Sequence, residues 1–114
     1  MTTTLSTQPQ ELNLNLYSGD GVTLLFTFLE DGSPWDTSGA WTAEVRRSEV
    51  GDVITSFTID NSVPTTGVVT ASLSGAQVRA IGNSAVWDLQ HVASGSEPRT
   101  FYRGAITVSS DVSR

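Results

Sequence analysis

The segment from Val22 to Arg47 constrains the fold of this chain more than any other. Apolar and polar residues alternate in its first half, a turn follows, and the alternation resumes in its second half. Successive side chains of an extended chain point to opposite faces, so every second residue shares one face. In the first half of the segment that shared face is apolar: Val22, Leu24, Phe26 and Phe28. Asp31-Gly32-Ser33-Pro34 then ends the strand, since glycine allows a positive φ and proline lacks an amide donor. A polar corner at 35–39 leads into a second alternating run, which predicts two strands joined by a tight connection.

Short alternating runs separated by turn residues recur along the whole sequence, and this pattern predicts an all-β fold. Seven strands are expected at short, regular spacing: Leu12–Leu16, Val22–Glu30, Ala40–Arg47, Val53–Ile59, Gly67–Leu73, Ala85–Ala93 and Arg99–Ser109. One short helix is expected at Gly75–Ile81, because Ser74 and Gln77 have the spacing of a capping box and Gly82 can stop the helix. The pattern is typical of a seven-stranded immunoglobulin-like β-sandwich with one short helical turn.

The length of 114 residues fits one domain with a single core. Residues 1–9 are polar, and Pro9 closes them off from the first alternating run. We therefore expect a flexible or partner-docked N-terminal arm at 1–9 and a β-sandwich domain at 10–114.

The net charge of −6 argues against binding to a phosphate backbone, which requires a basic surface. Like copies of such a chain repel one another, so an oligomer needs a specific interface. The N-terminus has neither the cationic nor the apolar region of a secretion signal, and no stretch has the length of a membrane span. The sequence predicts a soluble protein that binds neither nucleic acid nor membrane.

Residues for catalysis are scarce, since the chain has no cysteine and His91 is its only histidine. His91 follows a strand pattern and has no nucleophile motif near it, so we expect no enzyme, no cofactor and no metal centre. Five aspartates fall in expected turns, where such side chains usually accept from local amides: Asp20, Asp31, Asp36, Asp52 and Asp60. A calcium site built from two of these loops is the alternative for them.

The expected contacts with other proteins come from residues that the strand pattern leaves outside the core. Trp35 follows Pro34 in the polar corner, where it either covers the end of the sandwich or anchors a partner. In the last strand, Phe101 and Arg103 share the face opposite Tyr102 and are expected to meet a neighbouring subunit if that strand lies at an edge. The candidate interface residues are Trp35, Phe101, Arg103, Leu12 and Leu14.

The segment Asp31–Arg46, with its pattern DG-x-P-x-D-x-[ST]-G before a strand that ends in Val-Arg, resembles a known group of proteins. It is similar to a small β-sandwich domain of tailed-phage virion proteins, of the type found in the N-terminal domain of upper-baseplate proteins and in LtfC-like collar proteins. The segments Leu73–Gln77, Ala85–Gln90 and Tyr102–Arg114 resemble small virion proteins of phages that infect actinobacteria.

The resemblance implies a structural role and supplies no catalytic residue. It implies an accessory subunit on the exterior of a virion that is assembled in the host cytoplasm, either a head decoration protein or a minor tail or collar protein. The baseplate proteins continue into further domains, whereas this sequence ends with the sandwich, and this departure favours a stand-alone subunit. The expected partners are further copies of the chain and a phage capsid or tail protein. The alternative is a carbohydrate- or host-surface-binding module, in which an exposed Trp35 and turn aspartates would hold a sugar.

Overall fold

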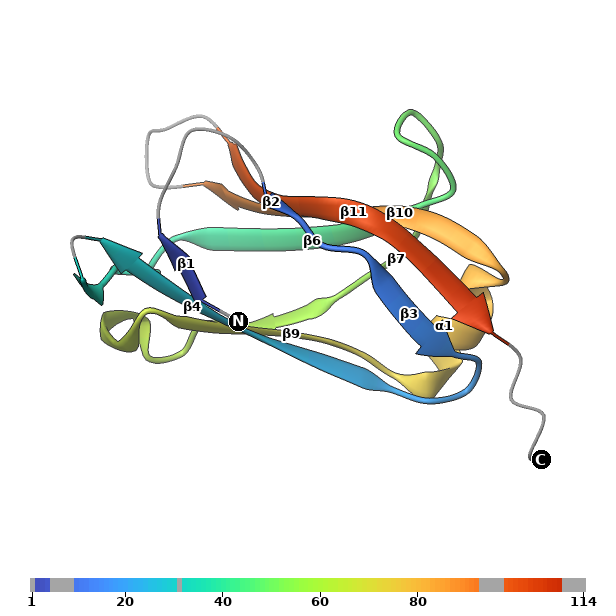
Figure 1. The fold of residues 1–114 in the computed structure, drawn as a ribbon, viewed down its shortest axis with the longest axis horizontal. Coiled ribbons are helices and arrows are strands. Elements are labelled where there is room, and N and C mark those ends of the chain that lie inside the picture. Colours follow the sequence, from blue (N-terminus) through green and yellow to red (C-terminus); the bar gives the residue numbers. More distant parts are fainter. Residues whose placement is uncertain (1, 5–9, 31, 93–97, 110–114) are drawn as a thin grey trace.

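The computed structural model describes residues 2–4, 10–30, 32–92 and 98–109 as two β-sheets packed face to face, with one α-helix (Figure 1). The first sheet contains β1 (Thr2–Thr4), β4 (Val22–Glu30), β5 (Ser33–Pro34), β8 (Thr58–Asp60) and β9 (Val68–Leu73). The second sheet contains β2 (Gln10–Glu11), β3 (Leu14–Tyr17), β6 (Ala40–Arg46), β7 (Val53–Ser56), β10 (Ser84–Val92) and β11 (Arg99–Ser109). A 3₁₀ turn, η1 (Pro64–Thr66), and the helix α1 (Gly75–Ile81) complete the described elements.

The strand order confirms the predicted all-β sandwich. The first sheet runs β1-β4-β9-β8, with β5 pairing the end of β4. The second runs β11-β10-β6-β7, with β2 and β3 both pairing the outer side of β11. The pairs β1–β4, β2–β11 and β3–β11 are parallel, and the other described pairs are antiparallel. The short strands β1, β2 and β3, which lie outside β4 and β11 in the two sheets, therefore all come from the N-terminal part of the chain.

The core follows the alternation read from the sequence. Phe26 and Phe28 are fully buried in β4, and the inward residues of β6 and β10 are buried against them: Trp41, Ala43, Val45, Trp87 and Leu89. The rings of Phe26 and Tyr102 lie 4.8 Å apart between centroids, which joins the two sheets across the middle of the sandwich. Aromatic pairs at such distances add to the stabilisation from burial alone.

The strand expected at Val53–Ile59 is two strands in different sheets, so that expectation was wrong. The chain leaves the second sheet after β7 and enters the first at β8, and the residue between them is Phe57. Phe57 is 5% exposed, its ring lies 5.5 Å from that of Trp87, and its amide donates to the Ala43 carbonyl at 2.8 Å. A single residue buried between the layers thus closes one side of the sandwich.

The expectation that Phe101 shares an outer face with Arg103 was also wrong. The register between β10 and β11 shifts at Leu89/Gln90, so that Tyr102 pairs with Leu89 and Thr100 with Gln90. Phe101 is the extra residue of this β-bulge, and a bulge breaks the strict alternation of faces. Both Phe101 and Tyr102 are consequently 3% exposed, while Arg103 is exposed. Nor is β11 an edge strand, because β2 and β3 cover its outer side.

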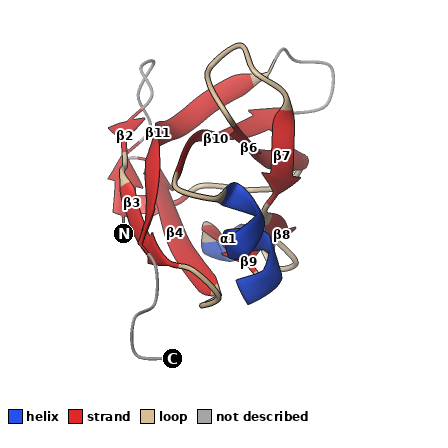
Figure 2. Ribbon diagram, turned by 90° about the vertical axis from the view of Figure 1, so that its right-hand side faces the viewer, coloured by secondary structure: helices blue, strands red, loops and turns tan. Residues whose placement is uncertain are grey.

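The predicted helix and its capping box are confirmed. The Ser74 hydroxyl accepts from the Gln77 amide at 3.2 Å, and the Gln77 side-chain oxygen accepts from the Ser74 amide at 2.8 Å. At the other end Gly82 has a φ of 82°, and the Arg47 guanidinium donates to the Ile81 carbonyl at 2.7 Å. Figure 2 shows α1 lying across one end of the two sheets, where its fully buried residues are Val78 and Ile81.

The N-terminal region takes three short strands. Of the arm expected at 1–9, residues 2–4 run parallel to β4 with Thr2 beside Thr27, and residues 1 and 5–9 lie outside the described part. The run expected at Leu12–Leu16 is interrupted, because β2 ends at Glu11 and β3 begins at Leu14. Residues 93–97 and 110–114 also lie outside the described part of the chain.

Candidate functional site

A trough of about 520 Å³ lies among described residues on the outer face of the second sheet. Strand register places one row of charged side chains across it, since Glu44 pairs with Asp88, Asp88 with Arg103 and Arg103 with Glu11. The four residues come from β6, β10, β11 and β2, and directly paired residues point to the same face of a sheet. Smaller residues line the floor beside this row, among them Val86, Thr100, Gly104 and Ala105.

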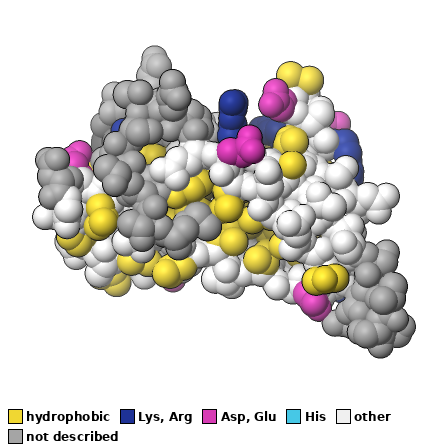
Figure 3. All heavy atoms as spheres, viewed as in Figure 1, with side chains coloured by type: hydrophobic (Ala, Val, Ile, Leu, Met, Phe, Trp, Pro, Cys, Tyr) yellow, Lys and Arg dark blue, Asp and Glu magenta, His cyan; other side chains and the backbone are white. Residues whose placement is uncertain are grey.

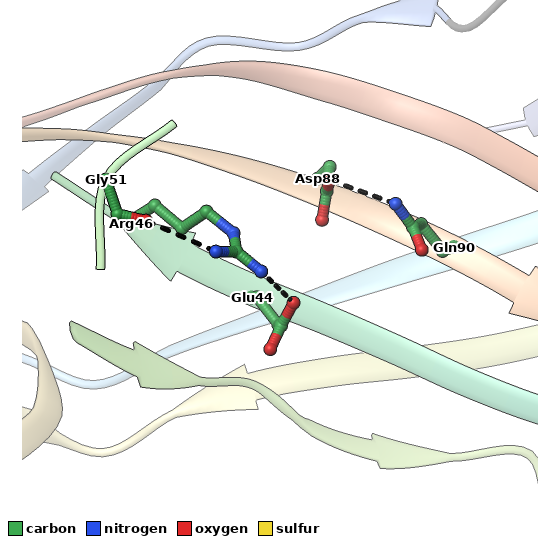
Figure 4. Close-up of polar contacts among 5 residues, drawn as sticks. All are labelled: Glu44, Arg46, Gly51, Asp88 and Gln90. Atoms are coloured by element: carbon green, nitrogen blue, oxygen red, sulfur yellow. Dashed lines mark hydrogen bonds and ion pairs between the residues drawn. The ribbon is translucent and has the colours of Figure 1, made fainter. Parts of the chain in front are cut away.

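Arg46 fixes one wall of the trough (Figure 4). Its guanidinium forms an ion pair with Glu44 at 2.7 Å and donates to the Gly51 carbonyl at 3.2 Å. It thereby connects β6 to the hairpin that leads into β7. Across the strand, the side-chain amide of Gln90 donates to Asp88 at 3.2 Å. Figure 4 shows that the Arg46–Glu44 and Gln90–Asp88 contacts stand on neighbouring strands.

The trough is acidic, and its charged groups act in opposite directions on the Asp88 carboxyl. Burial raises the pKa of the Asp88 carboxyl, the negative charge of Glu44 raises it further, and the guanidinium of Arg46 opposes both effects. Arg103, directly across from Asp88, is exposed, and its side chain makes no hydrogen bond or ion pair with a described residue. The trough therefore offers a free guanidinium and half-buried carboxylates to a partner molecule.

Trp35 covers the end of the sandwich and is half-buried there. Its ring lies edge-on to those of His91, Phe101, Phe28 and Trp41, with centroids 5.2, 5.5, 6.1 and 6.4 Å away. Of the two roles expected for Trp35, the structure thus favours the cover over the exposed anchor.

Hydrogen bonds connect the polar corner that follows Trp35 to the same cluster of aromatic rings. The indole of Trp41 donates to the Thr37 carbonyl at 2.7 Å. His91 is 5% exposed, and its Nε2 lies 2.7 Å from the Ser38 carbonyl. Because a carbonyl only accepts, Nε2 carries the proton in this contact. His91 therefore holds the corner in place as part of the aromatic packing.

The expected interface residues of the first strand divide between core and surface. Leu14 is 7% exposed and belongs to the core, whereas Leu12 is only partly buried. Figure 3 shows apolar side chains reaching the surface along the side of the molecule between the β2–β3 edge and β4. The partly buried apolar residues of this region, which we call the apolar strip, are Leu12, Leu16, Val22 and Leu24.

Two of the turn aspartates bind backbone amides, and Asp31 lies outside the described residues. Asp36 accepts from the Ser38 amide and Asp60 from the Ser62 amide, each at 2.9 Å, and these hydrogen bonds lower the pKa of both carboxyls. Within the described ranges, no three His, Asp or Glu side chains lie close enough together to hold a metal ion. No helix in the same ranges is both long and apolar enough to cross a membrane.

Of the charged row in the trough, the sequence pattern indicated only Arg103, as a candidate interface residue. It did not indicate Glu11, Glu44 or Asp88. The available signal was the position of Glu44 and Asp88 between inward residues of their strands, which places them on outer faces. The outer-face position alone does not show that these residues lie together, because that depends on the pairing register of four strands, which no single strand contains.

The sequence matches no model of a protein family and no curated protein. Among solved structures, the fold is similar to the N-terminal domain of phage TP901-1 ORF48, with a TM-score of 0.54 and 16% sequence identity. The similarity covers 95% of this chain and 96% of that domain's chain. At this identity the comparison shows that the two chains share a fold over almost their whole lengths.

Proposed function

We propose that the chain is a structural subunit of a bacteriophage virion that acts by protein–protein assembly. The observation that carries this proposal is the whole-length similarity in fold to a domain of a phage protein, the N-terminal domain of TP901-1 ORF48. Because a fold hosts many functions, the proposal also needs a surface fit for assembly. The trough and the apolar strip provide such surfaces.

The finer role we propose is an accessory subunit on the particle exterior, as a head decoration protein or a minor tail or collar protein. Its partners would be further copies and a phage capsid or tail protein, in a virion assembled in the host cytoplasm. The net charge of −6 supports this choice over nucleic acid or an anionic membrane as the partner. Leu12, Trp35 and Arg103 keep exposed surface and stay candidate contacts, whereas Leu14 and Phe101 are buried.

A carbohydrate- or host-surface-binding module is the second candidate, and the trough is the observation in its favour. Its carboxylates and guanidinium supply hydrogen-bonding groups at a concave surface. Trp35, however, packs edge-on against four rings and is half-buried, so it offers little open face for a sugar.

Particle incorporation tests the leading proposal, with Arg103→Gln as the central variant. The side chain of Arg103 is exposed and has no hydrogen bond or ion pair to a described residue, so its loss should leave folding unchanged and reduce recovery of the chain with purified particles. Arg79→Gln is the matched control, because Arg79 is exposed on α1 and the change in charge is the same. Equal incorporation of both variants would exclude Arg103 as a contact, and absence of the wild-type chain from particles would refute the proposal.

Two further variants separate the candidate functions. Deletion of residues 1–9 should weaken incorporation without preventing folding, and unchanged incorporation would remove the arm from the assembly interface. Asp88→Asn should leave the chain unable to bind glycans on an array if the second candidate is right, because Asp88 lines the trough, with normal incorporation into particles. Loss of incorporation with no wild-type glycan binding would favour assembly instead.

A further inference from the structure

The outer edge of β3 is open in the described structure. β3 pairs with β11 on one side, and the described strand order places nothing on its other side. Figure 1 shows β3 at the near edge of the molecule, with no described element in front of it. Unpaired amides and carbonyls at such an edge are a template for another strand.

The alternation of backbone N–H and C=O groups along β3 identifies which of them face its outer edge. The Ser18 amide donates to the Ser109 carbonyl at 2.8 Å, so the backbone groups of Ser18 face β11. Because these groups alternate sides along a strand, those of Leu16 and Leu14 also face β11, and those of Asn15 point away from the sheet. Asn15 therefore presents both an N–H and a C=O at the open edge, and its side chain is exposed.

The edge lacks the features that usually prevent strands from pairing. Charged residues, proline and bulges serve that purpose at natural edges. Residues 12–19 contain no charged residue and no proline, in a chain with a net charge of −6. Mutual repulsion between copies is therefore weak along this segment. Tyr17, at the end of β3, is 59% exposed, and the apolar strip lies beside the edge.

We propose that β3 pairs antiparallel with β3 of a second copy, about a two-fold axis that passes beside Asn15. This register lets the two Asn15 residues exchange both hydrogen bonds of a paired position. It sets Leu14 of each copy opposite Leu16 of the other on the inner face, and Asn13 opposite Tyr17 on the outer face. The strand is thus complementary to itself, as a two-fold interface requires, and the second sheet continues from one copy into the next.

The choice of a second copy as the partner follows from this symmetry. In the proposed register, apolar side chains lie opposite apolar ones and polar side chains opposite polar ones, so no different protein is needed to complete the pairing. The inference deepens the proposed assembly role and rests on it for its biological meaning. Dimer formation by the purified chain is nevertheless measured without any particle. A chain that dimerises but never enters particles would contradict the proposed function alone.

The test is the mass of the purified full-length chain by sedimentation velocity over a range of concentrations. The wild-type mass should rise from 12.1 kDa toward twice that value as concentration increases. Asn15→Asp and Asn15→Lys should each be monomeric, because like charges would face each other across the axis. An equimolar mixture of the two variants should regain the dimer, since opposite charges then meet at the same position.

Thr58→Asp is the matched control, because it adds the same charge to the exposed edge strand β8 and should leave dimerisation unchanged. Circular dichroism of each variant establishes that the sandwich remains folded. A wild-type chain of 12.1 kDa at every concentration would overturn the inference and leave this edge to a strand of a different protein. A dimer that survives Asn15→Asp, or a variant mixture that stays monomeric, would overturn it as well.

Discussion

Gly104 determines whether the N-terminal strand can lie against the sandwich, and Gly104→Ala is the most direct test of that role. Gly104 pairs with Trp87, whose indole donates to the Leu12 carbonyl at 2.9 Å. A Cβ at Gly104 would lie 2.6 Å from the Leu12 carbonyl carbon and would overlap its oxygen. Gly104 is absent from the glycines with positive φ, so close approach alone requires glycine here.

The expected cost follows from the contacts that the added methyl displaces. A buried indole N–H without its acceptor costs about 1–3 kcal/mol. Partial exposure of Leu12 and Leu14, as β2 and β3 move outward, adds about 1–2 kcal/mol. We therefore expect Gly104→Ala to lower the free energy of unfolding by about 3 kcal/mol, a large part of the 5–15 kcal/mol typical of a domain. The melting temperature should fall by roughly 10–20 °C.

Urea denaturation followed by tryptophan fluorescence measures this cost, and Gly32→Ala is the control. Gly32 has a φ of 80° with nothing within 4 Å of an added Cβ, so its substitution costs backbone strain alone, about 1 kcal/mol. In a chain that lacks residues 1–12, the difference between glycine and alanine at 104 should disappear, because the clashing carbonyl is gone. A Gly104→Ala cost no larger than that of Gly32→Ala would refute the reasoning.

Four further predictions concern the helix cap, the trough, the polar corner and the bulge. Ser74→Ala should lower the free energy of unfolding by about 1 kcal/mol in urea titrations, because the capping hydroxyl is lost. The raised pKa of Asp88 gives the folded chain stability that is complete below the ordinary value of 3.8 and is lost as pH rises through the raised pKa. Asp88→Asn should therefore stabilise near neutral pH and change nothing in strong acid, when unfolding is followed against pH. The lowered pKa of Asp36 predicts the opposite, stability that is present above 3.8 and lost as pH falls through the lowered pKa. Thermal unfolding should show a loss of about 3–5 kcal/mol for Phe101→Ala, and a change within about 0.5 kcal/mol for Arg103→Ala.

Local signals in the sequence were sufficient for much of the fold. The capping box needed only the spacing of Ser74 and Gln77, because both of its hydrogen bonds close within three residues. The inward face of β4 needed only alternation, and Phe26 and Phe28 are fully buried as that pattern predicts. Such features depend on neighbours along the chain, so one sequence contains all the information they require.

Features set by other strands could not be read in this way. Phe101 turns inward because the register with β10 shifts by one residue, which reverses every face assignment beyond the shift. The run at Val53–Ile59 divides because Phe57 fits between the sheets beside Trp87. The charged row of the trough likewise exists only through the pairing of four strands. The candidate site was thus less predictable than the fold, since every part of it depends on register.

The role of Gly104 and the proposed pairing of β3 concern the same element, which couples the stability of the sandwich to assembly. A second copy that pairs with β3 binds only chains in which β3 lies on β11, so dimerisation favours the docked strand by mass action. The wild-type melting temperature should therefore rise with protein concentration, and that of Asn15→Asp should not. Gly104→Ala, which displaces β3, should lose both the dimer and the concentration dependence. Differential scanning fluorimetry over a hundredfold range of concentration measures all three. A wild-type melting temperature independent of concentration, in a chain that does dimerise, would show that the dimer forms elsewhere than at β3.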